Sequence, residues 1–177
     1  MPSPTLTWLL DKNVARRAIE GISAAVTARA LTSEQSEAIR LITLSKQVGI
    51  TLAITPEAAN ILGRRSSLAI RLFLREVATR RRGRYWMRWA RRLRVHGFSP
   101  EDAAVLSYGT FGLDELGQTI GVTHIVTFDR PFLERFHRQR PVLEKRLKAM
   151  TSHLPEPYRL VALPEMIFPG QGLELLY

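Results

Sequence analysis

The sequence predicts an α/β domain with a mostly parallel central sheet. Three short apolar runs, rich in residues that favour β-structure, recur along the chain, and a fourth lies near its end: TLTWLL (5–10), ITLAIT (50–55), THIVTF (123–128) and YRLVAL (158–163). Helical patterns separate these runs, which is typical of strand–helix–strand units. The length of 177 residues suits one domain, and the apolar fraction of 45% is enough for a core.

The helices of the first half follow from local signals. A stretch rich in Ala and Ile, roughly 14–30, follows the first strand, which ends at Asp11. The stretch LTSEQSEAIRLITLSKQVG predicts a second helix, with Thr32 or Ser33 as its N-cap and a glycine just past its end. Pro56 then opens a third helix at the position where its missing N–H costs nothing.

Residues 64–94 carry nearly all of the excess charge. This segment holds twelve arginines and one acid, a net of +11, whereas the whole chain has a formal net charge of +10. Localised positive charge indicates a polyanionic partner. We expect two helices here, broken near Gly83. The candidate RNA contacts are Arg80, Arg81, Arg82, Arg84, Arg88, Arg91 and Arg92.

Aromatic residues interrupt these arginines, and they have two interpretations. Tyr85, Trp86 and Trp89 could stack on unpaired bases beside the guanidinium groups. They could equally pack inward from an amphipathic helix whose arginines stay in water. Both can hold at once, because a helix has two faces.

The second half begins with a strong helix start. Ser99 is a cap, Pro100 occupies the first helical position, and Glu101 and Asp102 lie in the first turn. A helix over about 131–150 follows the third strand. The fourth strand is expected to close at a proline, and the apolar tail after it packs either on the body or on a partner.

Three aspartates are predicted to share one edge of the sheet. Asp11 and Asp129 each follow a predicted strand, and Asp102 lies in the first turn of a helix. In parallel sheets, ligands bind at the carboxyl ends of the strands. Close carboxylates repel one another unless a cation neutralises them, and hard oxygen ligands select Mg²⁺ or Mn²⁺. Each residue also has a simpler interpretation as a helix cap or turn residue.

Other chemistries are disfavoured. The sequence lacks GxxxxGK[ST], GxGxxG and GxSxG motifs, and it has no cysteine. The four histidines show no metal-ligand spacing, and Asn13 stands where a DxD phosphotransferase has its second aspartate. No apolar run approaches the roughly 20 residues of a membrane span, so we expect a soluble cytoplasmic domain that does not associate with membranes.

The chain resembles the PIN-domain proteins, the ribonuclease fold of VapC-like toxins. The motifs are LLDKNV (9–14), SPEDAAVLSYGTF (99–111), THIVTFDRPF (123–132) and YRLVALPEMI (158–167), in the family's order. The resemblance implies a single PIN-like domain over residues 1–177, with a three-layer α/β/α Rossmann-like fold. The arginine-rich helical segment at 64–96 departs from the family, because it is longer and more basic than a minimal toxin needs.

The resemblance also implies site residues. Asp11, Asp102 and Asp129 would be the catalytic carboxylates that hold Mg²⁺ or Mn²⁺, and Thr127 would support them, with Asn13 in a supporting turn. The chain departs from the family at the fourth acid. That place holds Asn60 or Ile61, and Glu57 lies one turn earlier; Glu57 and Asn60 are therefore kept as supporting candidates.

Two functions follow as expectations. The first is a metal-dependent endoribonuclease that hydrolyses RNA phosphodiesters, with an antitoxin protein and a homodimer as further candidate partners. The second is a catalytically weakened PIN-like module that binds RNA or a protein, which the missing fourth acid favours. A basic DNA-associated α/β protein stays open as a third interpretation, because phosphate contacts do not distinguish nucleic acids.

Overall fold

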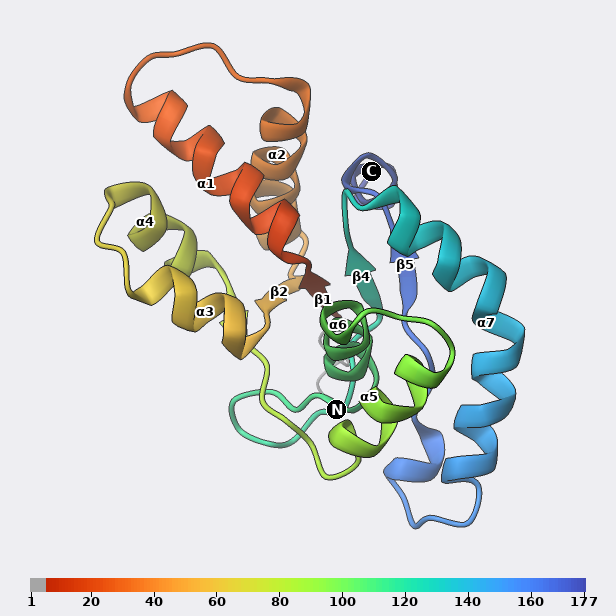
Figure 1. Cartoon of the computed structure of the whole chain (residues 1–177). Coiled ribbons are helices and arrows are strands. Elements are labelled where there is room, and N and C mark those ends of the chain that lie inside the picture. The colour runs from red at the N-terminus through yellow and green to blue at the C-terminus, as the bar shows by residue number, and fades with distance from the viewer. Residues whose placement is uncertain (1–5) are drawn as a thin grey trace.

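The computed structural model describes residues 6–177 and contains one five-stranded sheet in the order β3-β2-β1-β4-β5 (Figure 1). Every neighbouring pair of strands is parallel, which confirms the α/β prediction. The strands are β1 (Thr7–Leu10), β2 (Thr51–Ile54), β3 (Ala78–Thr79), β4 (His124–Val126) and β5 (Glu165–Ile167).

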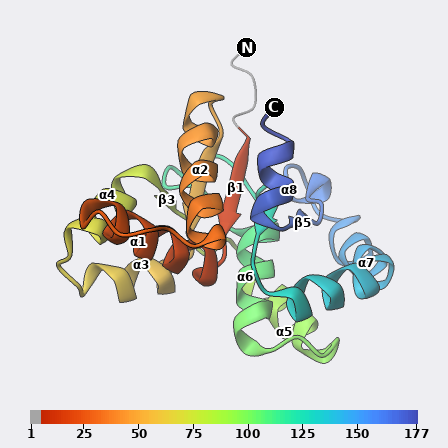
Figure 2. The ribbon, with the colours of Figure 1, turned by 90° about the horizontal axis from the view of Figure 1, so that it is seen from above.

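Eight α-helices connect and flank these strands: α1 (Lys12–Val26), α2 (Ser33–Gln47), α3 (Pro56–Gly63), α4 (Leu68–Glu76), α5 (Trp86–Val95), α6 (Pro100–Phe111), α7 (Arg130–Thr151) and α8 (Pro169–Glu174). Alternate strand residues point to two cores, as the pleat of a strand requires. Leu9 and Ile125 pack with α5, α6 and α7, whereas Leu10 and Val126 pack with α1, α2, α4 and α8. Figures 1 and 2 show these helix groups on opposite faces of the sheet.

Helix caps gather where the parallel strands end. Asp11 and Thr55 directly follow β1 and β2, and Asp129 lies three residues after the end of β4. Each accepts a backbone N–H at the start of the next helix. Ser99 caps α6, and Thr32, one of the two predicted N-caps of α2, forms a capping box there with Gln35. The sequence signals therefore placed these helix starts correctly, while α1 ends earlier than expected, at Val26.

One strand prediction was wrong, and one strand was not predicted. The run 158–163 begins with a 3₁₀ turn, Tyr158–Leu160, and Leu160 is 68% exposed, so this run does not enter the sheet. The strand instead follows Pro164, in a register that pairs Ile125 with Met166 and buries Met166. The two-residue strand β3 was not predicted, because its residues are only half-buried. Thr5, the predicted start of the first strand, lies outside the described residues.

The C-terminal tail packs on the body. Leu173 of α8 is buried in the core that contains Trp8 and Leu41. Gly172 permits this approach, since a Cβ there would lie 3.1 Å from carbon atoms of both Leu41 and Trp8. Within residues 6–177, no helix combines the length and the apolar character needed to cross a bilayer.

Candidate functional site at the carboxyl edge of the sheet

A polar junction ties the end of β1 to the end of β4. The Asp11 carboxylate is 6% exposed, and its Oδ2 accepts a hydrogen bond of 2.8 Å from the Thr127 hydroxyl. The same hydroxyl oxygen accepts from Asn13 Nδ2 (3.3 Å) and from the backbone N–H of Asp129 (2.9 Å). Asn13 Oδ1 accepts from the N–H of Phe128 at 3.1 Å. The structure therefore brings together four of the predicted site residues.

Asp11 is a buried acid with an altered titration. Burial raises the pKa of its carboxyl group, and the hydrogen bonds from Thr127 and from the backbone N–H of Lys12 oppose that rise. The nearby charge of Glu101 raises the same pKa further. Lys12 lies in an ion pair of 2.5 Å with Glu101. A buried carboxylate at the end of a strand is a feature that functional sites commonly contain, although structural networks contain it too.

Asp102 and Asp129 extend this cluster, and we call the three acids the aspartate edge (Asp11, Asp102 and Asp129). Burial raises the pKa of Asp102, and the charge of Asp129 raises it further, as expected for neighbouring carboxylates. Asp129 Oδ1 accepts the N–H of Phe132 at 3.0 Å. The capping interpretation is thus confirmed for Asp11 and Asp129, and it leaves other lone pairs of both carboxylates free.

The donor chemistry of the aspartate edge suits Mg²⁺ or Mn²⁺, but the arrangement does not. In the described part of the chain, no three acidic or histidine side chains are grouped so that they could hold one metal ion. The residues as they stand therefore do not fit a preformed divalent-metal centre.

The candidate fourth acid points elsewhere. Glu57 Oε1 accepts from the Tyr108 hydroxyl and from Arg82 Nη2, both at 3.0 Å. Burial, with a smaller contribution from Glu57, raises the pKa of Tyr108 to about 12, so its hydroxyl keeps its proton at neutral pH. Asn60 and Ile61 are both exposed on α3, and Ile61 is 60% exposed. None of these side chains supplies a further ligand to the aspartate edge.

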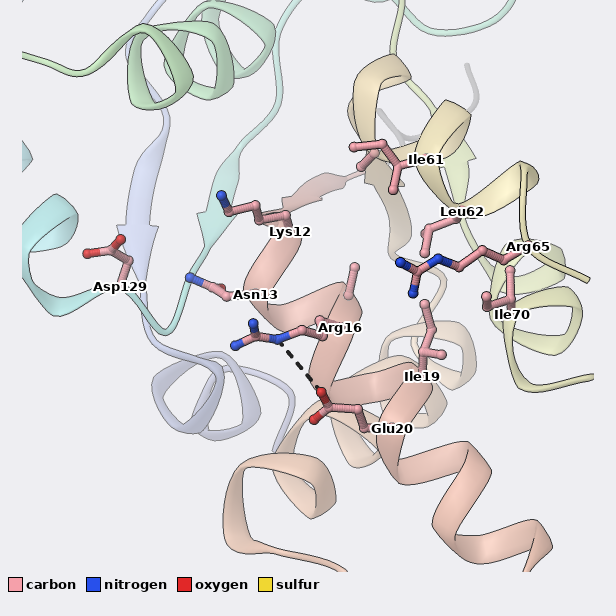
Figure 3. A pocket seen from close by; sticks show the side chains of 12 residues that line it. Lys12, Asn13, Arg16, Ile19, Glu20, Ile61, Leu62, Arg65, Ile70 and Asp129 are labelled. Atoms are coloured by element: carbon pink, nitrogen blue, oxygen red, sulfur yellow. Dashed lines mark ion pairs between the residues drawn. The ribbon is translucent and has the colours of Figure 1, made fainter. Parts of the chain in front are cut away.

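A pocket of ≈ 610 Å³ opens beside this edge, between α1, α3 and α4 (Figure 3). Its walls include Ile61, Leu62 and Ile19, and its rim includes Lys12, Arg65 and Asp129. Figure 3 shows Asp129 across the pocket from Leu62 and Arg65. Sequence reasoning missed the basic rim; the position of Lys12 directly after Asp11 was the available signal.

Most of the predicted RNA contacts are exposed, but Arg80 is not. Arg80 is 2% exposed, and its Nη2 donates to the carbonyl oxygens of Gly112 (2.6 Å), Gly121 (2.8 Å) and Thr119 (3.2 Å). Its guanidinium therefore holds the loop that follows α6 and cannot reach a polyanion. The prediction that Arg80 contacts RNA is thus wrong. Nothing in the sequence distinguishes this buried arginine from the exposed arginines that follow it.

The other arginines divide by their partners. The Arg82 guanidinium donates hydrogen bonds to Glu57 and Tyr108, and its Cζ atom lies 4.3 Å from the centre of the Trp86 ring. Arg81 donates to the Glu115 carbonyl at 3.0 Å. The remaining four are exposed, and no ion pair found within residues 6–177 includes them. We call them the α5 arginine face: Arg84, Arg88, Arg91 and Arg92.

The tryptophans of this segment belong to the core. Trp86 is 6% exposed and Trp89 is fully buried, and both pack with α6 residues. The ring centres of Trp86 and Tyr108 lie 5.0 Å apart, and those of Trp89 and Phe111 lie 6.4 Å apart. The inward-packing interpretation is therefore confirmed, and stacking of these indoles on bases is excluded in this arrangement.

Comparisons of the chain with protein-family models, with curated proteins and with solved structures give no match. The resemblance to PIN-domain proteins accordingly rests on the motifs of the sequence. The proposals below are argued from those motifs and from the geometry of the site.

Proposed function

We propose that the protein is an RNA-binding protein with a PIN-like fold. The parallel sheet and the position of the aspartate edge support the PIN-like assignment, because the family's motifs imply acids at the ends of the first and fourth strands. The observation that carries the RNA-binding function is the α5 arginine face, which is exposed and lacks acidic partners among the described residues. Guanidinium groups bind phosphates through planar, bidentate hydrogen bonds.

The charge around this face is not neutralised by its own segment. No aspartate or glutamate occurs between Glu76 and Glu101, and this interval contains eight arginines. Surface potentials of one sign attract oppositely charged polymers, and phosphate contacts supply most non-specific binding to nucleic acids. The proposal therefore concerns recognition of the RNA backbone.

The test is direct binding of labelled RNA to the whole chain by fluorescence anisotropy, over a series of salt concentrations. We expect the affinity to fall steeply with salt, because each neutralised phosphate releases counterion. Competition with DNA of the same sequence separates RNA binding from general polyanion binding. Absence of RNA binding at about 50 mM salt would refute the proposal.

A metal-dependent ribonuclease is the second candidate, and the Asp11–Thr127–Asp129 junction favours it. Because the described residues contain no preformed metal centre, this function requires the acids of the aspartate edge to rearrange around the ion. The Asp11 carboxylate is buried and accepts from the Thr127 hydroxyl, which in turn accepts from the backbone N–H of Asp129; this network is more than capping requires. RNA cleavage that needs Mn²⁺ and disappears in both Asp11→Asn and Asp129→Asn would establish this function. Binding without cleavage, under the same conditions, would leave the first proposal alone.

A further inference from the structure

The helix α5 has two faces with separate roles. Its buried side consists of Trp86, Trp89, Ala90 and Leu93, at the spacing of one helical stripe. Its other side is exposed and carries three members of the α5 arginine face, at positions 88, 91 and 92. Arg84, two residues before the helix, lies against the same hollow of ≈ 530 Å³ as these three. The arginines thus form one rigid row on a packed helix.

This row offers charge without a free aromatic platform. Trp86 and Trp89 are buried, and the half-buried Tyr85 is already engaged: its ring packs edge-on against Tyr158, with ring centres 4.8 Å apart, and the Arg84 guanidinium lies over it at 5.5 Å. The apolar side chains that accompany the arginines in the hollow are Met87 and Val95. Proteins that bind single strands rely on aromatic platforms for successive bases. The α5 arginine face has no such platform, so it is suited to phosphates alone.

Phosphates are presented most densely and most rigidly by a double helix. In a duplex the bases are paired and hidden, and recognition proceeds through backbone contacts and shape. Each contact also gains more from counterion release on a duplex, with a salt slope of about 0.9 per phosphate against about 0.7 on single strands. A rigid row of arginines without stacking groups therefore matches a duplex better than a flexible strand.

We propose that the α5 arginine face binds the sugar–phosphate backbone of double-helical RNA segments, irrespective of sequence. This inference rests on the proposed RNA-binding function and names its substrate class. The turn after α5 leads directly into α6, whose first turn contains Asp102. Arg135 of α7 fixes that turn through a hydrogen bond of 2.5 Å to the Gly97 carbonyl. Figure 2 shows α5 alongside the start of α6.

An anionic membrane is a poorer partner for the same helix. Helices that lie in a membrane interface insert a broad apolar side that contains Trp, Phe or Leu. In α5 that side is already packed on α6, and only Met87 and Val95 are exposed among the arginines. The charge complementarity of the free face is therefore with a polymer of phosphates.

The experiment compares a short blunt RNA duplex with one of its strands, each binding to the whole chain over about 50–200 mM salt. If the duplex and the strand bind equally at 1 M salt, four phosphate contacts should favour the duplex about sixfold at about 0.1 M salt, because the two salt slopes differ by about 0.8. The test variant replaces Arg88, Arg91 and Arg92 with Ala. It should lower the salt slope on the duplex by about 3 and leave the melting temperature unchanged.

The matched control removes the same charge from the same arginine-rich segment but from α4 and its approach: Arg64→Ala, Arg71→Ala and Arg75→Ala, all exposed. This control should change the duplex slope by less than about 1. If the test variant melts early, Arg91→Ala alone should still lower the slope by about 1.

The possible failures are distinguishable. A strand that binds as tightly as the duplex refutes the duplex inference and leaves RNA binding intact. Equal loss of slope in both triple variants would show diffuse charge, and it also refutes a site on α5. Loss of binding to anionic vesicles in the test variant, without loss of duplex binding, assigns the face to membranes. Wild-type protein that binds neither RNA probe refutes the proposed function itself.

Discussion

Replacing Arg80 tests whether the arginine-rich segment contains a structural member. In Arg80→Ala, the carbonyls of Gly112 and Gly121 lose donors at 2.6 and 2.8 Å in a buried environment. Hydrogen bonds to a charged group contribute about 1.5–3 kcal/mol each. Burial lowers the pKa of Arg80, which shows that its charge is partly desolvated, so relief of that cost offsets part of the loss. We expect a net destabilisation of about 3 kcal/mol.

For a chain of this size, 1 kcal/mol corresponds to about 2–4 °C, so the melting temperature should fall by roughly 6–12 °C. Thermal denaturation followed by circular dichroism measures this shift, and urea unfolding checks it independently. Arg81→Ala is the control, because the Arg81 side chain is exposed and makes one hydrogen bond, to the Glu115 carbonyl. This substitution should lower the free energy of unfolding by no more than about 1 kcal/mol. An unchanged melting temperature in Arg80→Ala, together with weaker RNA binding, would contradict the structural role.

Three further variants test the core and the edge. Trp89→Ala should cost about 3–5 kcal/mol in urea unfolding, since Trp89 is fully buried. Gly83→Ala should lower the melting temperature markedly, because its Cβ would lie 2.0 Å from the Phe111 carbonyl oxygen, whereas Gly63→Ala, with nothing within 4 Å, should not. Asp11→Asn should gain stability relative to wild type as pH rises above the ordinary carboxyl pKa of 3.8. The reason is that the raised pKa of Asp11 in the folded state makes its ionisation cost free energy, and the variant does not pay this cost. A difference in melting temperature between variant and wild type that does not change with pH would contradict this.

The fold was largely predictable because its signals are local. The strands β1, β2 and β4 are buried apolar runs, and the caps Thr32 and Ser99 bond within their own helix starts. The strand β5 was missed because its three residues are less apolar than the run 158–163 before Pro164. Register with β4, rather than composition, selects which of the two segments enters the sheet.

The candidate site was predictable only in part. Asp11 and Asp129 come together because parallel strands end at one edge, which sequence order reveals. The direction of each side chain depends on partners far along the chain, such as Tyr108 for Glu57. Arg80 is buried whereas Arg81 is exposed, and the carbonyls that hold the Arg80 guanidinium lie more than 30 residues later, at Gly112 and beyond. Neighbouring arginines in one run therefore cannot be sorted without tertiary contacts.

The two faces of α5 make stability and RNA binding separable in this protein. The tryptophans supply buried area against α6, so their loss should lower the free energy of unfolding, while the protein that remains folded keeps the salt dependence of RNA binding. The arginines on the other side contact no acid in the described residues, so their loss should leave the fold intact and change the salt dependence of binding. If one variant of either kind changed both properties together, α5 would be coupled to its ligand through the core, and the surface model would have to be abandoned.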